Sequence, residues 1–434
     1  MPFKKYELKN KTTVFLVPQP DAQSTTVLVL YPVGSRYENN KLAGVSHFIE
    51  HLMFKGTKKR PTSLALTREI DRLGAEYNAF TSKEYTGYYI KSDAKYLDIS
   101  LDILCDMLNN SKFDAKEMAK EKKVIVEELR MYNDNPLINI ENVFENLIFK
   151  DTDLGRNIGG SETSVLNLPR AEVLKYYHNF YAPENTYIAV AGAVGGNTVK
   201  LIEKYFGHVN PAKAGHVASH AKSLHSRVPS RNYSPAKFGP ETKTARIAVE
   251  KKPTDQVQLM LGLPGLDHND KRNEVLSVLN TILGGSMSSR LFSEIREKRG
   301  LAYMVRSGEM NYRDTGFFDV RMGLEAKNIN GALQVVKKEM EKIIKSGVTV
   351  KELKDAKTHL HGALTLSMED SSTQASWYLQ QALFLNEIKT PAERLKEIDR
   401  VTNVQIKKLA KEIFVWNKVR VAIIGNVEKE NIKF

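Results

Sequence analysis

Two histidines and a glutamate lie close together in the stretch GVSHFIEHLMFKGT at residues 44–57. His47 and His51 are four residues apart, so on a helix both imidazoles project from one face and can bind the same ion. Zinc suits such a pair, with bonds of about 2.0–2.1 Å to imidazole nitrogen. Glu50 flanks that position without lying between the ligands, which suits a base that takes a proton from water.

The pattern His-x-x-Glu-His arises by chance often enough to require a third ligand from another element. The later stretch AKEMAKEKKVIVEELRMYNDNP offers several acids. Glu121 and Glu128 are about two turns apart on a helix and share a face, whereas Glu127 is rotated by about 100° from Glu128. One acid of the pair can bind the metal while the other hydrogen-bonds a histidine or the water. The alternative is a solvated helix face with Glu–Lys pairs, which we prefer for Glu117 and Glu127.

Apolar periodicity predicts the elements that carry these residues. In the first half, alternation predicts strands near 5–18, 25–33, 75–81 and 84–92. Helical periodicity predicts helices near 42–55, 62–73, 95–109, 114–133 and 170–179. Because strands follow one another as hairpin neighbours, we expect an α+β fold, an antiparallel-rich sheet with helices packed on one face.

The chain reads as two related halves. LKYYHNFYAPENTYIAVAGAV late in the first half resembles IKKLAKEIFVWNKVRVAIIGNV late in the second, each a helix, a break and an apolar strand. We therefore predict duplicated domains at 1–208 and 241–434, joined by a basic linker at 209–240. The linker histidines are expected to be solvated. The second half has NEVLSVLNTILGGSMSSRLF in place of the histidine motif, so one zinc site per chain is expected.

Composition narrows the class of protein. The 434 residues carry a net charge of +13, but basic and acidic residues are interspersed and no nucleic-acid motif is present. No run of about 18 apolar residues and no targeting peptide is found, which predicts a cytoplasmic protein that binds neither nucleic acid nor membranes. The single cysteine, Cys105, lies in an apolar run and is expected to be a buried structural thiol.

Several long motifs match a known family: GSRYENNKLAGVSHFIEHLMFKGTKKRP, LGAEYNAFTSKEYTGYY, EKKVIVEELRMYNDNP and LGGSMSSRLFSEIREKRGLAYMV. On these motifs the sequence resembles the inverzincin zinc metallopeptidases of the pitrilysin, insulin-degrading-enzyme and mitochondrial-processing-peptidase family. The shorter bacterial members are closest in form. The resemblance covers nearly the whole chain except the linker, and it implies the two-domain fold of that family.

The resemblance also implies roles for the metal-site residues. It makes His47, His51 and Glu128 the zinc ligands, Glu50 the catalytic base and Glu121 a supporting acid. The second half has no such ligand set but contains EIREKRGLAY.

Substrate contacts are implied on two further segments. Asn78, Ala79, Phe80 and Thr81 match the family strand that pairs with an extended peptide, a case of β-augmentation. In the second half, Arg296 would hold a substrate carbonyl and Tyr303 would donate to the oxyanion.

The expected function is zinc-dependent endopeptidase action on peptides or unfolded segments. A chain of this length would supply half of a closed chamber, so the resemblance implies a homodimer, or a heterodimer with a paralogue, whose sites are completed in trans. The alternative is a non-catalytic structural or partner subunit. The net basic charge and the lack of a transit peptide favour a microbial peptidase over a processor of mitochondrial presequences.

Overall fold

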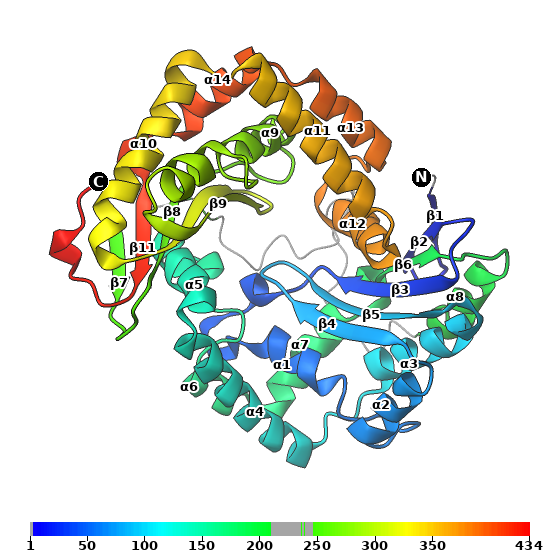
Figure 1. Ribbon diagram of the computed structural model, residues 1–434. Helices are drawn as coiled ribbons and strands as arrows, with labels where there is room; N and C mark the ends of the chain where they lie inside the picture. Colours follow the sequence, from blue (N-terminus) through cyan, green and yellow to red (C-terminus); the bar gives the residue numbers. More distant parts are fainter. Residues whose placement is uncertain (1–2, 210–235, 237, 239–245) are drawn as a thin grey trace. The chain divides into compact units, whose positions relative to one another are not determined.

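The computed structural model describes residues 3–209, 236, 238 and 246–434, and they form two compact units (Figure 1). Unit 1 comprises Met1–Leu129, Arg156–Tyr233 and Leu366–Thr390. Unit 2 comprises Arg130–Gly155, Ser234–Thr365 and Pro391–Phe434. The predicted linker at 209–240 lies almost wholly outside the described residues.

The described part of unit 1 is built on a sheet of six strands in the order β1-β2-β6-β3-β5-β4. Their bounds are β1 (Lys4–Glu7), β2 (Thr13–Pro18), β3 (Ser24–Tyr31), β4 (Glu76–Thr81), β5 (Thr86–Asp93) and β6 (Tyr187–Gly192). Only the β2–β6 pair is parallel among these strands, which confirms an antiparallel-rich sheet. The strand expected at 5–18 is a hairpin, because the chain turns between Leu8 and Thr12.

One face of this sheet carries most of the helices of unit 1. They are α1 (Val45–Leu52), α2 (Ser63–Asp71), α3 (Leu97–Asn110), α4 (Ala115–Asp134), α6 (Glu162–Leu166), α7 (Arg170–Phe180) and α8 (Thr198–Phe206). Helix α1 shows why they pack there: Val45, Phe48, Ile49 and Leu52 follow the spacing of one helix face and are buried. They join a core with strand residues such as Val27.

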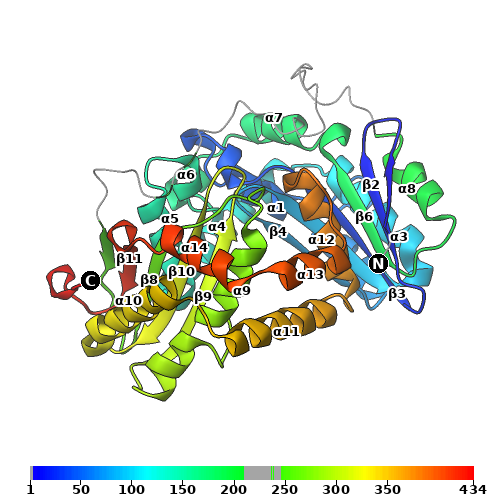
Figure 2. The ribbon, with the colours of Figure 1, turned by 90° about the horizontal axis from the view of Figure 1, so that it is seen from above.

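The opposite face of the unit 1 sheet is covered by α12 (Ser371–Phe384), a helix from the second half of the sequence (Figure 2). Tyr378 and Leu379 of α12 pack against Phe15 and Leu28. The α+β class is confirmed, but helices cover both faces rather than the single face expected. The reason is that strand residues pointing away from α1 are also apolar and need cover.

Unit 2 repeats this plan. Among the described residues its sheet has the order β7-β11-β8-β10-β9. The strands are β7 (Ile247–Glu250), β8 (Val257–Pro264), β9 (Ala302–Asn311), β10 (Gly316–Leu324) and β11 (Arg420–Ile424). The β7–β11 pair is parallel and the other pairs are antiparallel. In both sheets the last strand of the order, β4 or β9, forms an edge.

The helices of unit 2 are also divided between the two faces. The larger core involves α9 (Asn273–Leu283), α10 (Ile329–Ser346), α11 (Val350–Ser367), α13 (Pro391–Arg400) and α14 (Asn403–Ile413). The other face is covered by α5 (Pro136–Ile148), whose Ile140 and Phe144 pack against Phe317. Each unit therefore takes one helix from the other half of the sequence.

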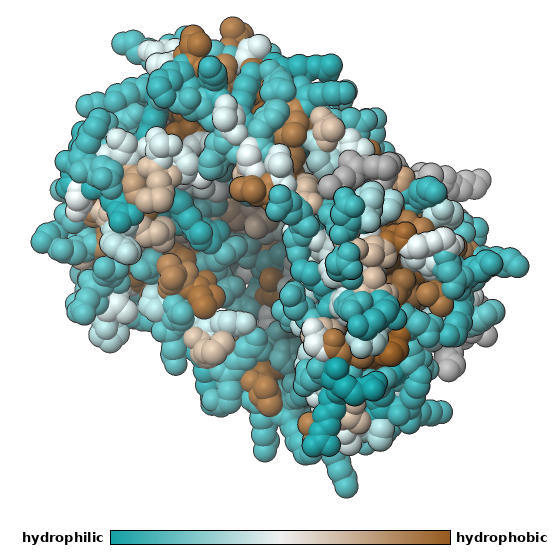
Figure 3. Space-filling view, turned by 45° about the vertical axis from the view of Figure 1, so that its right-hand side comes forward, coloured by the Kyte–Doolittle hydropathy of each residue, from teal (hydrophilic) through white to brown (hydrophobic). Residues whose placement is uncertain are grey.

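The surface, the helices and the single cysteine of the described residues can be compared with what the sequence predicts. Hydrophilic side chains dominate the face shown in Figure 3, and apolar residues form small groups on it. No helix in the described ranges has both the length and the apolar character needed to cross a bilayer. Burial raises the pKa of Cys105 to about 12, and its Sγ lies 3.1 Å from the carbonyl oxygen of Tyr205, in agreement with a structural thiol.

Candidate metal centre

Helix α1 holds His47, Glu50 and His51 on the side away from the buried stripe. His47 and His51 retain 13% and 19% of their side-chain exposure, so both rings are partly buried yet can be reached from solvent. Their ring centroids are 4.6 Å apart. The four-residue spacing therefore places the two imidazoles side by side, as expected from the sequence.

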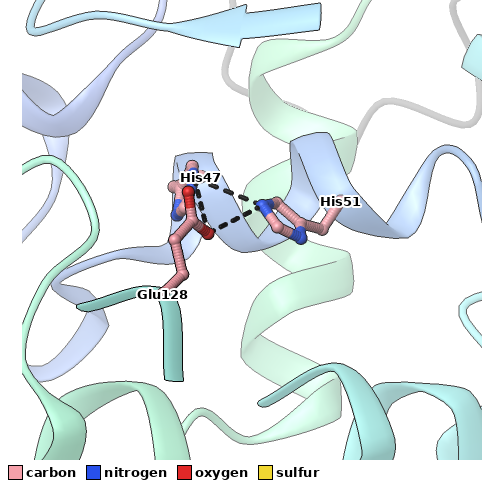
Figure 4. A group of neighbouring side chains, drawn as sticks. All are labelled: His47, His51 and Glu128. Atoms are coloured by element: carbon pink, nitrogen blue, oxygen red, sulfur yellow. Dashed lines mark hydrogen bonds and ion pairs between the residues drawn. The ribbon is translucent and has the colours of Figure 1, made fainter. Parts of the chain in front are cut away.

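The third group comes from α4. Glu128 Oε2 lies 3.7 Å from His47 Nε2 and 3.4 Å from His51 Nε2, and the two Nε2 atoms are 3.3 Å apart (Figure 4). Ligands bound to one zinc at about 2.0–2.1 Å in tetrahedral geometry are about 3.3 Å from one another, so the donor set and its spacing fit zinc. Within the described ranges this is the one group of three or more His, Cys, Asp or Glu residues with ligand atoms this close.

The other ring nitrogen of His51 is held by Glu121. Its Oε1 lies 2.8 Å from His51 Nδ1, and its Oε2 lies 2.6 Å from Lys55 Nζ. Burial opposes the charge of Glu121, but the hydrogen bonds to His51 and Lys55 outweigh burial and lower its pKa. An ionised Glu121 fixes a proton on Nδ1 of His51 and so leaves Nε2 free to bind a metal.

The two histidines differ in basicity. Burial, together with the charge of His51, lowers the pKa of His47 to about 4. Burial acts in the same direction on His51, but hydrogen bonding to Glu121 and Glu128 outweighs it and raises the pKa to about 9. Without metal, His51 therefore carries the proton at neutral pH and His47 does not.

Glu50 lies beside the three candidate ligands. Its Oε2 accepts a hydrogen bond of 2.5 Å from Thr81 Oγ1, which joins α1 to the edge strand β4. Burial raises the pKa of Glu50, and the hydrogen bond from Thr81 partly opposes that rise. A carboxylate with a raised pKa is a better proton acceptor near neutral pH than an ordinary surface glutamate.

Strand β4 holds the four residues predicted to contact substrate. It pairs with β5 and with no other described strand, so one side of its backbone is open to an added strand. Ala79 packs toward the α1 core, whereas Phe80 packs on the α12 side. Asn78 Oδ1 accepts from the backbone N–H of Ala79. Of the four, Thr81 is in direct contact with a predicted catalytic residue.

Arg296 and Tyr303 belong to unit 2. Arg296 lies on a π-helical turn, Phe292–Glu297, and its guanidinium stacks on Phe292 at 4.8 Å and Tyr303 at 5.1 Å. Tyr303 is 73% exposed, so its side chain is largely accessible to solvent. The structure brings Arg296 and Tyr303 together, and their role toward a substrate stays a prediction.

Sequence reasoning missed two residues that support α1. Lys55 contacts Glu121, and its place four residues after His51 could have indicated this. Glu38 is a buried carboxylate that accepts from backbone N–H groups at the start of α1. No regular spacing connects Glu38 to the histidine motif, so the sequence contains no signal that could have identified it.

Comparison with known proteins places this site in a family. Residues 13–162 match the family model "Insulinase (Peptidase family M16)", and residues 167–360 match "Peptidase M16 inactive domain". A Bacillus subtilis protein named "Uncharacterized zinc protease YmxG" is 33% identical over 411 residues, which cover 95% of each chain. The chain belongs to the M16 family of zinc metallopeptidases. The metal-site residues all lie in the part that matches the first M16 model.

Solved structures share this M16 fold. A protease from Helicobacter pylori superposes with a TM-score of 0.88 at 25% identity, covering 98% of this chain and 99% of that one. A chain of complex III2 from Candida albicans has a TM-score of 0.81 at 17% identity, covering 98% and 97%. The second likeness concerns the fold alone. Since one fold serves such different proteins, the function must be argued from the side chains of the site.

Proposed function

We propose that this chain is a zinc-dependent endopeptidase that hydrolyses peptides or unfolded segments, with one zinc ion per chain. The observation that carries the proposal is the convergence of His47, His51 and Glu128 at 3.3–3.7 Å from one another, with Glu50 beside them. Membership of the M16 family supports the general class, a zinc metallopeptidase. This donor set supports the more specific proposal of a hydrolytic zinc site in this chain.

Four residues of the chain would form the zinc site. His47, His51 and Glu128 would hold zinc, and Glu121 would orient the ring of His51. When bound, zinc supplies a Lewis acid that polarises a carbonyl and lowers the pKa of water to about 7. Three protein ligands leave a coordination position open, as hydrolytic zinc sites require.

Glu50 is the proposed general base. Its carboxylate would accept a proton from the attacking water and later pass that proton to the leaving amine. Thr81 holds the Glu50 carboxylate at 2.5 Å and so restricts its rotamers. The raised pKa of Glu50 favours both transfers near neutral pH, because the group can then be deprotonated and reprotonated in one cycle.

Substrate binding is proposed at the open edge of β4. An extended peptide would add to this edge through backbone hydrogen bonds along Asn78–Thr81, which makes binding tolerant of side chains. Arg296 and Tyr303 would contact the substrate carbonyl and the oxyanion. We propose a dimer, with an identical chain or a paralogue, as the assembly that completes such a chamber. With its single inert cysteine, the chain would act in the cytoplasm.

Metal analysis and cleavage of a quenched peptide test the proposal together. We expect one zinc per purified chain, cleavage that a chelator abolishes and zinc restores, and loss of both zinc and cleavage in His51→Ala. Cleavage that persists after complete removal of metal would contradict the proposal. A protein that binds zinc but cleaves no member of a peptide library would instead support the non-catalytic partner subunit.

A further inference from the structure

Glu38 is a buried carboxylate that the chemistry proposed above does not use. It is 2% exposed, and both of its oxygens accept backbone hydrogen bonds at the start of α1. Oε2 accepts from the N–H of Gly44 at 2.7 Å, and Oε1 accepts from the N–H of Ser46 at 2.8 Å. The first N–H groups of a helix have no partner within the helix, and a negative charge near them is favourable.

The helix needs this distant cap because Gly44 cannot be replaced by an ordinary capping residue. Gly44 is the N-cap of α1, has a φ of +92° and offers no side chain. A Cβ atom at this position would lie 2.5 Å from the carbonyl oxygen of Gly159. Ser, Thr, Asp or Asn is therefore excluded at the N-cap, and Glu38 supplies the acceptor oxygens instead.

The chain around Gly159 lies against His47 itself. A Cβ on Gly159 would be 2.8 Å from Leu129 Cδ2 and 3.6 Å from His47 Nδ1. His47 Nδ1 is buried and has no hydrogen-bond partner among the described residues, so no hydrogen bond at that nitrogen orients the ring. The orientation of His47 thus depends on the backbone of the first turn of α1 and on close packing.

Arg156 connects the two segments that enclose this turn. Its Nη1 donates to the carbonyl oxygen of Glu38 at 2.7 Å and to that of Ser35 at 3.3 Å. Its Nε donates to Asn40 Oδ1 at 3.2 Å. The segment that carries Glu38 is therefore fixed to the segment that carries Gly159.

We propose that Glu38 is a positioning residue for His47. It fixes the backbone of the first turn of α1, through the N–H groups of Gly44 and Ser46, so that His47 Nε2 faces His51 Nε2 and Glu128 before metal binds. The inference rests on the proposed zinc site and adds to it the group that preorganises His47, the ligand whose Nδ1 has no hydrogen-bond partner among the described residues. Residue Ser46 carries the effect directly, because it precedes His47 in the chain.

The test compares zinc affinity in Glu38→Gln with that in a matched variant of unit 2. Glutamine keeps the size of Glu38 but presents an amide N–H₂ to one backbone N–H group. Glu145→Gln is the control, because Glu145 is 5% exposed and accepts a hydrogen bond of 2.7 Å from Tyr312. Zinc dissociation constants are measured on metal-free protein with a competing chelator, alongside melting temperature, kcat and KM.

We expect Glu38→Gln to weaken zinc binding about 10- to 100-fold and to lower kcat at saturating zinc, with KM changed less than about twofold. Glu145→Gln should lower the melting temperature without changing zinc affinity. Zinc affinity in Glu38→Gln equal to that of the parent would overturn the inference. Absence of zinc binding by the parent would instead overturn the proposed function, and the inference with it.

A second variant keeps the inference testable if Glu38→Gln does not fold. Arg156→Gln leaves both oxygens of Glu38 in place but loosens the segment that holds them. It should weaken zinc binding by a smaller factor, about 3- to 10-fold. Unchanged affinity in Arg156→Gln would mean that the first turn of α1 keeps its geometry without this support, which contradicts the inference.

Discussion

The same structural plan occurs twice in this chain with different contents. In unit 1, helix α1 packs against the edge strand β4, and in unit 2 helix α9 packs against the edge strand β9. Between α1 and β4 the polar link is Thr81 to Glu50. Between α9 and β9, Ser277 Oγ donates to Glu309 Oε1 at 2.6 Å, and Ser307 Oγ donates to Asn280 Oδ1 at 2.5 Å.

The difference lies in where the lone pairs point. In unit 1, two imidazoles and a carboxylate direct lone pairs at one shared position, which is unfavourable unless a cation or a proton occupies it. In unit 2, the hydroxyl, amide and carboxyl groups between α9 and β9 bond to one another. A polar layer between helix and edge strand is thus compatible with the fold in both units. The proposed zinc site of unit 1 uses two imidazoles from α1, whereas α9 carries no histidine and offers no such ligands.

Of the changes that test this comparison, Glu50→Gln is expected to have the largest effect, a fall in kcat. Glutamine retains the shape and can accept from Thr81, but it cannot take up a proton, so kcat should fall by about 10³-fold. Zinc content should remain at one per chain. The measurement is steady-state cleavage of a quenched peptide together with elemental analysis.

Ser277→Ala is the matched change in unit 2. It removes the hydrogen bond from helix to strand at the equivalent layer and should leave kcat within about twofold of the parent. If Ser277→Ala reduced kcat as strongly as Glu50→Gln, the polar layer of unit 2 would take part in the reaction, and the contrast between the units would be wrong.

The second prediction concerns pH and the metal. Without metal, the pKa of His51 is raised to about 9, and zinc requires the neutral ring, so a proton must leave when zinc binds. Zinc affinity should rise about tenfold per pH unit between roughly pH 7 and 9, and one proton should be released per ion near pH 7.5. Calorimetry in buffers of different ionisation enthalpy measures this release. Binding without proton release would contradict the assignment of the proton to His51.

Local spacing explains how much of the site could be predicted from the sequence. The pairing of His47 with His51 depends on one helix, and so does the shared face of Glu121 and Glu128. Which acid of α4 approaches the histidines depends on packing, and only the family resemblance distinguished Glu128 from Glu121. The structure brings both acids into contact with His51, Glu128 at Nε2 and Glu121 at Nδ1, and their roles stay predictions.

Contacts between distant segments explain what was missed. Glu38 reaches α1 across a turn whose course depends on the close approach of Gly44 to Gly159. No periodic pattern in the sequence indicates that these two segments meet. The same holds for α5 and α12, which look like ordinary amphipathic helices but belong to the unit of the other half. Periodicity predicts that a helix has a buried face, but it does not specify the sheet that covers that face.

A third prediction concerns the acid that holds His51. Glu121→Gln should keep a hydrogen bond to the ring of His51 but lose the negative charge that pairs with Lys55 and stabilises the proton on His51 Nδ1. Zinc affinity should fall about 10-fold. The measurement is chelator competition, with Glu145→Gln as the control, because Glu145 is a buried acid of unit 2 that accepts a hydrogen bond from Tyr312. Equal loss of zinc affinity in both variants would indicate general destabilisation.

The smallest expected effect is on stability and concerns Glu309, the buried acid between α9 and β9 of unit 2. Burial raises its pKa to about 7, against a partial opposing effect of Ser277, and its Oε2 has no hydrogen-bond partner among the described residues. Between about pH 4.5 and 7 the folded state therefore keeps a proton that the unfolded state has lost, so this group's contribution to the free energy of unfolding decreases as pH rises through that window. Glu309→Gln mimics the protonated form. The variant should match the parent near pH 5 and exceed it by about 1–3 kcal/mol at pH 7.5 in denaturant unfolding. A variant that is equally destabilised at both pH values would show that Glu309 is ionised in the folded protein. The carboxyl between α9 and β9 of unit 2 would then be charged, as the proposed base Glu50 is between α1 and β4 of unit 1.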